Sequence, residues 1–102
     1  MINVTVSYTV KPEFVAENRR NIQNFLADFK KMDNAKFIYT VDLKNDGLTF
    51  VHSSRYTDAT IQQEVLNVPS FLEFQKKRDE SGLNDSHKVE ILEYIGSSKP
   101  IL

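Results

Sequence analysis

The chain has 102 residues, 40% of them hydrophobic and 26% charged, which is the composition of one globular domain. Its formal charge of −1 argues against a nucleic-acid-binding protein, and the absence of cysteine excludes disulfides, thiolate nucleophiles and cysteine metal ligands. The sequence has no apolar run near the roughly 20 residues that span a bilayer and no signal-peptide pattern at its start. We therefore expect a single cytoplasmic domain over residues 1–102, with a short tail at 97–102 and no membrane partner.

The first expected element is a strand over residues 2–10, where apolar and polar side chains alternate strictly. Pro12 then suits the first turn of a helix, because its missing N–H would be unpaired there anyway. The apolar residues that follow recur at intervals of three and four, which predicts an amphipathic helix ending near Met32-Asp33-Asn34. Those apolar positions are Val15, Ile22, Phe25, Leu26, Phe29 and Met32.

Two further strands are expected at 36–44 and 48–56, joined by a turn at Asn45-Asp46-Gly47. Asp-Gly is a strong signal for a two-residue hairpin loop, which would place Leu43 opposite Phe50. This register gathers one set of side chains on the same side of the hairpin, and a slip of one residue would mix that set with the other face. The set comprises Phe37, Tyr39, Val41, Leu43, Phe50, His52, Ser54 and Tyr56.

The second half of the chain begins with a helix start at Thr57-Asp58. Pro69 interrupts this helix, and Ser70 to Glu73 has the spacing of a capping box for a second helical piece. Gly82 is the expected C-terminal cap, and a fourth strand is expected from Lys88 to Ile95. We interpret the charged residues of the helical region as a solvated face, namely Glu64, Glu73, Lys76, Lys77 and Arg78.

The resulting order, β-α-β-β-α-β, predicts an α+β, ferredoxin-like fold in which helices cover one face of a four-stranded antiparallel sheet. The aromatic side of the hairpin should face the helices. No G-x-S-x-G motif or glycine-rich loop occurs, and the two histidines lack metal-ligand spacing. We therefore expect no metal and no cofactor, so that any catalysis would use ordinary side chains in a shaped pocket.

His52 is the main candidate functional residue, because its pKa lies near neutrality and it falls mid-strand on the aromatic side. It could act as a general base or hydrogen-bond donor, or be a core histidine with one satisfied hydrogen bond. The hydroxyls of Tyr8, Tyr39 and Tyr56 could orient a ligand or simply find partners at the edge of the core. Arg55 falls on the opposite side of the strand, so we interpret it as a surface or interface residue.

Several segments resemble the antibiotic biosynthesis monooxygenase (ABM) domain, over about residues 2–96. They are Tyr8–Pro12, Asp46–Phe50, Tyr56–Asp58, Glu64–Phe71 and Phe74. The resemblance implies a homodimer with a dimeric α+β barrel, in which two sheets pack face to face. It also implies a pocket between each sheet and its helices, and some members of the family oxygenate phenolic or quinol-like aromatics without metal or flavin.

Carried over to this chain, the resemblance implies a small aromatic ligand with His52 and Tyr56 as catalytic groups. The substrate-binding residues would be Tyr39, Phe50, Ser54, Phe71 and Phe74. Haem-degrading members resemble one another in an asparagine, a tryptophan and a histidine, but the nearest positions here are Thr5, Tyr56 and Gln75. Ser70 stands where many quinol-type members have a histidine after proline. Haem degradation is therefore not expected.

Three functions stay open from the sequence: a cofactor-independent monooxygenase, a non-catalytic dimeric module that binds a small molecule or acts in a stress response, and a structural module for a protein partner. The first predicts an apolar cavity that holds His52. The second predicts a cavity without a base or one open to water, and the third predicts no cavity and a large exposed apolar patch.

Overall fold

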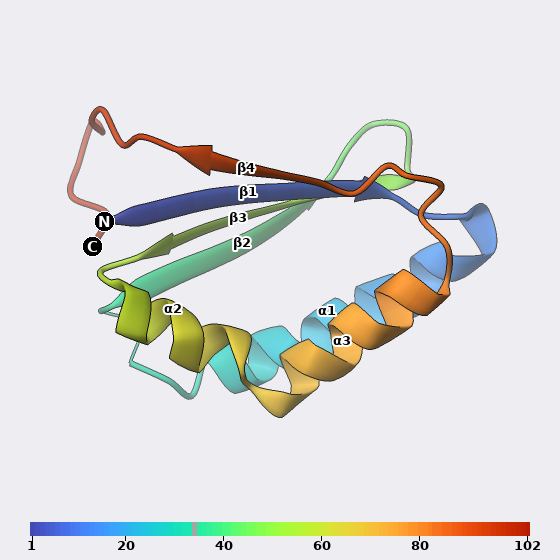
Figure 1. Ribbon diagram of the computed structural model, residues 1–102, viewed down its shortest axis with the longest axis horizontal. Coiled ribbons are helices and arrows are strands. Elements are labelled where there is room, and N and C mark those ends of the chain that lie inside the picture. The colour runs from blue at the N-terminus through green and yellow to red at the C-terminus, as the bar shows by residue number, and fades with distance from the viewer. Residues whose placement is uncertain (34) are drawn as a thin grey trace.

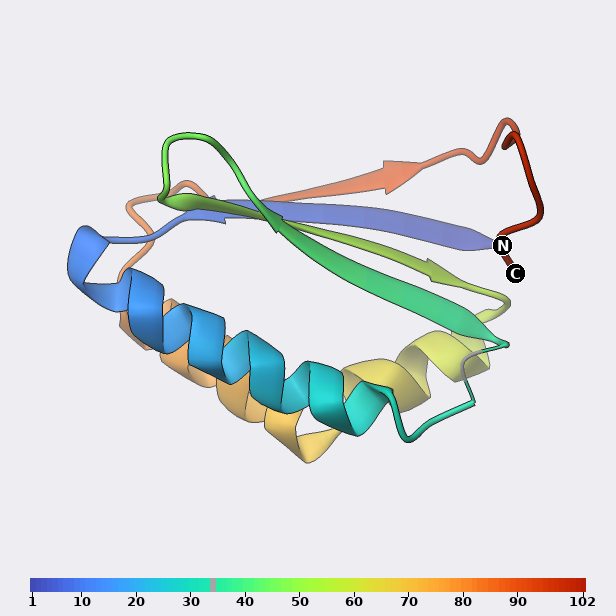
Figure 2. The same ribbon diagram turned by 180° about the vertical axis from the view of Figure 1, so that it is seen from behind.

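A computed structural model describes residues 1–33 and 35–102 of the chain. Helices cover one face of a four-stranded sheet, as Figures 1 and 2 show from opposite sides. This is the α+β, ferredoxin-like arrangement that the sequence predicts. In chain order the elements are β1 (Ile2–Thr9), the 3-10 turn η1 (Pro12–Phe14), α1 (Val15–Phe29), β2 (Phe37–Leu43), β3 (Thr49–Tyr56), α2 (Ala59–Leu66), α3 (Pro69–Glu80) and β4 (Lys88–Leu92).

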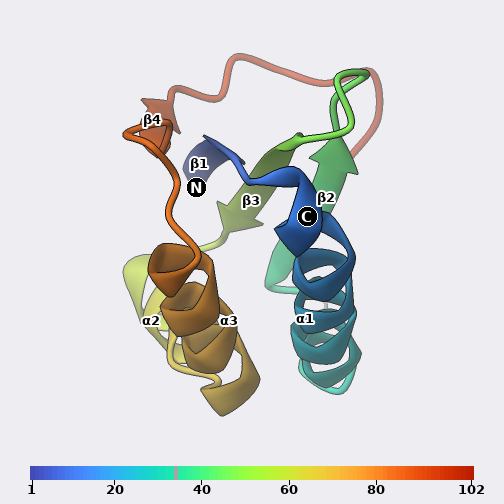
Figure 3. The ribbon, with the colours of Figure 1, turned by 90° about the vertical axis from the view of Figure 1, so that its right-hand side faces the viewer.

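The sheet has the strand order β2-β3-β1-β4, and every neighbouring pair is antiparallel. The β2–β3 register is the one that the sequence predicts: Phe37 pairs with Tyr56 and Leu43 with Phe50. Seen from its end in Figure 3, the sheet lies over two helical arms, with α1 on the β2 side and α2 and α3 on the β4 side.

The hairpin loop is longer than predicted, although the register is unchanged. The ladder ends where the Lys44 N–H donates to the Thr49 carbonyl, so the loop comprises residues 45–48. Its conformation is stabilised by Asp46, whose Oδ1 accepts from the backbone N–H groups of Leu48 and Thr49, both at 2.8 Å. Gly47 follows with φ of +73°, which a glycine adopts without strain. The Asp46 carboxylate thus replaces the backbone bonds of a tight two-residue turn.

Two helix boundaries differ from the prediction. The α-helical run of α1 ends at Phe29, because the N–H groups of Lys31 and Met32 donate to carbonyls only three residues back. The predicted end at Asn34 lies outside the described residues. The capping box at Ser70 was also wrong: Pro69 occupies the first position of α3, and the Ser70 hydroxyl donates instead to Asp28 of α1 at 2.6 Å.

The fourth strand ends at Leu92 and not at Ile95, because its partner runs out. Leu92 pairs with Asn3, one residue from the start of β1. The segment beyond it turns back toward the N-terminus in Figure 1, and Ile101 shares a shallow groove with Ile38 and Arg55 on the outer sheet face. Arg55 belongs to that face as predicted, and it donates to the Asn3 side chain at 3.1 Å.

The other helix ends follow the sequence. Asp58 caps α2 by accepting from the Ile61 N–H at 2.9 Å, and Gly82 follows α3 with φ of +84°. None of the described helices is long and apolar enough to cross a bilayer.

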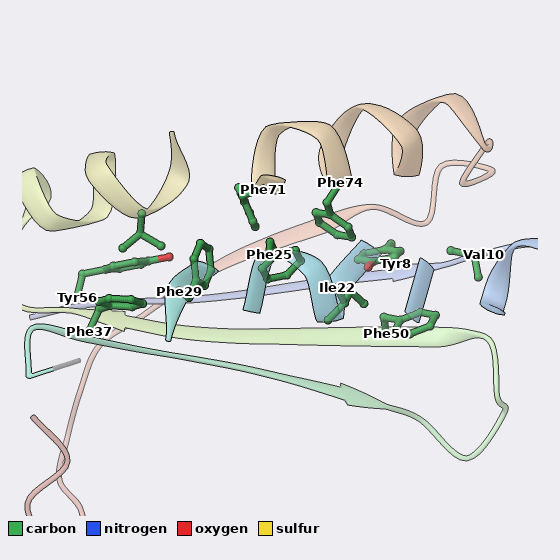
Figure 4. Packing of buried hydrophobic residues seen from close by; sticks show 11 residues of the cluster. Tyr8, Val10, Ile22, Phe25, Phe29, Phe37, Phe50, Tyr56, Phe71 and Phe74 are labelled. Atoms are coloured by element: carbon green, nitrogen blue, oxygen red, sulfur yellow. The ribbon is translucent and has the colours of Figure 1, made fainter. Parts of the chain in front are cut away.

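Aromatic rings fill the space between the sheet and the helices (Figure 4). Phe25 of α1 is at the centre, with ring centroids 5.0 Å from Phe71 and 4.9 Å from Phe74 of α3. These contacts join the two helical arms. The Phe25 ring also lies 5.5 Å from that of Tyr39 on β2, so Phe25 contacts both α3 and the sheet. Each such aromatic pair adds to the free energy gained by burying the rings.

We expect Phe25→Ala to lower the free energy of unfolding by about 3–5 kcal/mol, because it leaves a cavity where α1 and α3 meet. Urea unfolding followed by circular dichroism would measure the loss. Leu72→Ala is the matched control: its side chain lies on α3 but is exposed, so its effect should stay within about 0.5 kcal/mol. Equal losses in the two variants would contradict this assignment of the core.

Candidate functional site

A cavity of about 290 Å³ lies between the sheet and the helices α2 and α3. This volume is near the lower end of the range for small-molecule pockets, roughly 300–1,000 Å³. Its inner wall includes Tyr39, His52, Ser54, Tyr56, Phe71 and Arg78. Val89 and Ile91 of β4 also line it and are themselves exposed, so the cavity is open on the β4 side.

Five of the seven predicted site residues line this cavity, whereas Phe50 and Phe74 do not. Phe50 lies at the start of β3, beside a separate groove formed with α1 and β2. Phe74 packs behind the site, where its ring stacks on the imidazole of His52 at 5.3 Å. The structure therefore brings together the polar candidates and one of the three phenylalanines.

His52 is buried on β3 with both ring nitrogens hydrogen-bonded. The Tyr8 hydroxyl is 2.7 Å from Nε2, and the Tyr39 hydroxyl is 2.8 Å from Nδ1. Only 2% of the residue is exposed. The imidazole therefore has two tyrosine partners, and neither nitrogen is free to contact a ligand directly.

Burial, together with the positive charge of Arg78, lowers the pKa of His52 to about 3. The imidazole is therefore neutral at physiological pH, so that one of its nitrogens donates and the other accepts. Burial also raises the pKa of the Tyr8 and Tyr39 hydroxyls, which keeps both phenols protonated. The pKa of Tyr56 is raised by burial too, with a smaller opposite effect from Ser54.

Arg78 is a buried cation in the cavity wall, which corrects its assignment to a solvated helix face. It is only 7% exposed. Its guanidinium lies over the rings of Tyr8 and Phe74, at 5.5 and 5.4 Å from their centroids. Nε donates to Asp79 at 3.0 Å, but that carboxylate is largely exposed. The signal was its spacing: Arg78 follows Phe71 and Phe74 at helical intervals of seven and four residues.

Asn18 is a second functional candidate that the sequence reading missed. It is fully buried on α1, and its Nδ2 donates to the Tyr8 hydroxyl at 2.9 Å. It falls on the apolar stripe of α1, four residues before Ile22, so its position in that stripe was the available signal.

The site combines a cation, a neutral imidazole and phenol hydroxyls around partly apolar space. In the part of the chain that the structure describes, no three histidine, aspartate or glutamate side chains are placed to hold a metal ion. The chemistry that these groups support is the binding of an oxygen anion: Arg78 supplies positive charge, and a tyrosine hydroxyl can donate to the same oxygen.

The chain shares its fold with several solved structures. An antibiotic biosynthesis monooxygenase matches with a TM-score of 0.78 and 11% sequence identity, over 94% of this chain and 100% of the other. Rv0793 from Mycobacterium tuberculosis matches with a TM-score of 0.79 and 17% identity, over 96% and 98%. SnoaB, a cofactor-independent oxygenase from Streptomyces nogalater, matches with a TM-score of 0.72 and 16% identity, over 97% of each chain.

No protein-family model matches the sequence, and no curated protein matches it. The structural matches cover nearly the whole chain and include the family that the sequence resembles. The chain therefore has the α+β fold of the antibiotic biosynthesis monooxygenases. At these identities the match defines the fold alone, and function depends on the residues of the cavity.

The buried imidazole makes stability depend on pH. The unfolded chain binds a proton at His52 below about pH 6.5, but the folded chain does so only near pH 3. The contribution of His52 to the free energy of unfolding is therefore at its maximum above pH 6.5, and it is lost as the pH falls toward 3. Between about pH 6 and pH 4, the free energy of unfolding should fall by about 1.4 kcal/mol per pH unit more steeply in the wild type than in His52→Gln.

Urea unfolding at a series of pH values would measure this difference in slope. The control is His87→Gln, because His87 is exposed at the rim of the cavity, and its profile should follow that of the wild type. Parallel profiles for wild type and His52→Gln would show that the imidazole is not held neutral by burial.

Proposed function

We propose that the chain is a cofactor-independent monooxygenase that acts on a small phenolic or quinol-like aromatic, bound in this cavity as the phenolate. The observation that carries the proposal is the buried Arg78 in the wall of the same cavity as the hydrogen-bonded Tyr39–His52 pair. Among the described residues, the acidic partner that Arg78 has is the exposed carboxylate of Asp79. A buried cation paired in this way is costly, and an anionic ligand oxygen would complete its pairing. Phenolate binding therefore suits the electrostatics of the cavity.

The proposed reaction uses the reducing power of the substrate itself. A phenolate gives electrons to O₂, and the ring carbon that gains oxygen becomes a carbonyl. The second oxygen atom leaves as water, with the two electrons and two protons supplied by the substrate. What the protein has to do is stabilise the anion, orient it and keep bulk water from the intermediates.

Each lining residue has a role in this proposal. Arg78 stabilises the anion, and Tyr39 donates to the same oxygen while His52 holds the Tyr39 hydroxyl in place. Tyr56 and Ser54 offer polar contacts deeper on β3, and Phe71 supplies an apolar wall. Phe50 and Phe74 support the site from outside the cavity. SnoaB, which has the same fold, is a cofactor-independent oxygenase, so the fold is compatible with this class of reaction.

A second candidate, a non-catalytic module that binds a small aromatic, is favoured by one observation. Both nitrogens of His52 are occupied and its pKa is lowered to about 3, so the imidazole is a weak base. On that account the same cavity binds a phenolate and returns it unchanged. Oxygen consumption separates the two candidates.

We expect the wild-type protein to consume one O₂ for each oxygenated product, a hydroxyquinone from a hydroquinone or a quinone from an anthrol, with the second oxygen atom released as water. Arg78→Met should lower this rate roughly tenfold or more, because it removes a charge-assisted contact to the phenolate. Lys77→Met is the matched control: it removes a neighbouring cation that pairs with Glu73 on the exposed side of α3 and should leave the rate unchanged. An oxygen electrode with product chromatography gives both quantities.

Two results would count against catalysis. Oxygen uptake at the same rate in the wild type and Arg78→Met would exclude the proposed anion site. Tight binding of the aromatics without any oxygen uptake would favour the non-catalytic module.

We also propose that the chain forms a homodimer through β4. All five residues of this edge strand are exposed, and Ile91 is 82% exposed. Leu92, on the opposite side of the strand, and Ile95 beyond it are also exposed. An apolar edge strand is an unusual surface for a monomer. A second copy packed here would cover Val89 and Ile91, and so would close the open side of the cavity.

Ile91→Lys should convert the dimer to a monomer, because it places a charge in the proposed contact. Sedimentation velocity at micromolar concentration would show the change in mass. Asn24→Lys adds the same charge on the exposed side of α1 and should stay dimeric. A wild-type protein that sediments as a monomer would contradict the proposed homodimer.

A further inference from the structure

Four side chains from four elements form one continuous chain of hydrogen bonds. Asn18 of α1 contacts Tyr8 of β1, Tyr8 contacts His52 of β3, and His52 contacts Tyr39 of β2. The three links measure 2.9, 2.7 and 2.8 Å. Of the four residues, Asn18 and Tyr8 lie behind the cavity wall, whereas His52 and Tyr39 line it.

The direction of the first bond favours one direction for the others. If His52 also donated to Tyr8, the single proton of the Tyr8 hydroxyl would be buried with no acceptor among the described residues. The Asn18 amide donates to the Tyr8 oxygen, so the proton of Tyr8 is available for Nε2 of His52. A neutral imidazole that accepts at Nε2 carries its proton on Nδ1, and it therefore donates to the Tyr39 oxygen. The proton of Tyr39 is then left over, and among the described residues no side chain or carbonyl accepts it.

The opposite direction would leave the Tyr8 proton without an acceptor among the described residues unless the Asn18 amide were turned over. In the observed orientation Oδ1 of Asn18 is buried and has no partner among the described residues. Turning the amide would bury both N–H bonds of Nδ2 without an acceptor, in place of one carbonyl oxygen. Unpaired buried N–H groups are rarer than under-satisfied carbonyls, so the observed direction is the favourable one.

We infer that the Tyr39 hydroxyl is the ligand-contacting end of this hydrogen-bond chain and donates to an acceptor oxygen of the ligand. Asn18, at the other end of the hydrogen-bond chain, sets the direction in which its bonds are donated. The inference rests on the proposed function and deepens it by naming the ligand atom: a phenolate or carbonyl oxygen, in preference to a group that only donates. Asn18, Tyr8 and His52 are positioning residues.

The test compares two probes of similar shape and opposite polarity, 4-nitrophenolate and 4-nitroaniline. Both have visible absorbance, and neither is an electron-rich substrate, so binding is measured without turnover. Tyr39→Phe should weaken phenolate binding roughly tenfold or more, while nitroaniline binding stays within about twofold. A packing defect would weaken both probes. Tyr94→Phe, which removes an exposed hydroxyl bonded to Ser97, is the matched control and should change neither affinity.

Two further variants test the direction in which the hydrogen bonds from Asn18 to Tyr39 are donated. Asn18→Asp, with an acceptor-only carboxylate, should reverse it, so that Tyr39 donates to His52 and offers only its lone pairs to the cavity. Nitrophenolate affinity should then fall, and nitroaniline affinity should rise by roughly twofold to tenfold. Tyr8→Phe interrupts the chain without adding charge, and it should lower the phenolate-to-aniline affinity ratio even if Asn18→Asp does not fold.

The outcomes separate this inference from the proposed function. A phenolate-to-aniline ratio that is the same in wild type, Tyr39→Phe and Tyr8→Phe overturns the inference alone. Absence of oxygen uptake with hydroquinones, together with the expected changes in this ratio, overturns the oxygenase and leaves the binding mode in place. If the wild-type protein binds neither probe, both proposals are contradicted.

Discussion

The contact on which the site depends is the imidazole of His52 held between the hydroxyls of Tyr8 and Tyr39. It requires three adjacent strands in one register. His52 is paired with Val6 of β1 and Val41 of β2, and each tyrosine lies two residues along its strand from that pairing partner. Diagonal neighbours of this kind are within reach of long aromatic side chains, and a slip of one residue would send a tyrosine to the outer face.

That contact also explains how a polar group is accommodated in an aromatic core. A buried imidazole without partners would cost free energy, but two hydrogen bonds of 2.7 and 2.8 Å satisfy both nitrogens. Stacked rings, including that of Phe74 at 5.3 Å, surround it. A neutral histidine with both nitrogens hydrogen-bonded exchanges protons poorly. The polar groups of the cavity wall that remain available to a ligand therefore include Tyr39 and Arg78.

Arg78 gives the cavity wall a buried positive charge. Its guanidinium lies over two aromatic rings, which partly compensate a buried cation, and Asp79 pairs with it from the exposed side. A ligand oxygen with negative charge would be the remaining partner. The same positive charge adds to the effect of burial in lowering the pKa of His52, so the position of Arg78 also helps to keep the imidazole neutral.

Much of the fold could be predicted from the sequence, because alternation and turn chemistry are local. The β2–β3 register followed from the hydrophobic pattern even though the loop itself differed, since Asp46 made bonds that residue type alone does not specify. Ser70 was misassigned because its spacing from Glu73 fits a capping box, whereas its actual partner, Asp28, lies on another helix that the local sequence does not reveal.

The site was harder to predict than the fold. His52 was placed on the inner face from alternation alone, but its two partners come from other strands. Arg78 was missed because its charge suggested a solvated helix face, and Asn18 was not considered as a candidate, although both lie on the buried stripes of their helices. The contacts of these two residues with Tyr8 depend on how the helices pack on the sheet, and the sequence pattern of one helix does not specify that packing.

The tautomer and charge of His52 are the central claim, and ¹⁵N NMR of the imidazole nitrogens measures both directly. Spectra recorded from about pH 8 down to about pH 4 should show one neutral form throughout, with the proton on Nδ1. Protonation of His52 near its ordinary pKa of 6.5, or a proton on Nε2 in the neutral form, would contradict the account.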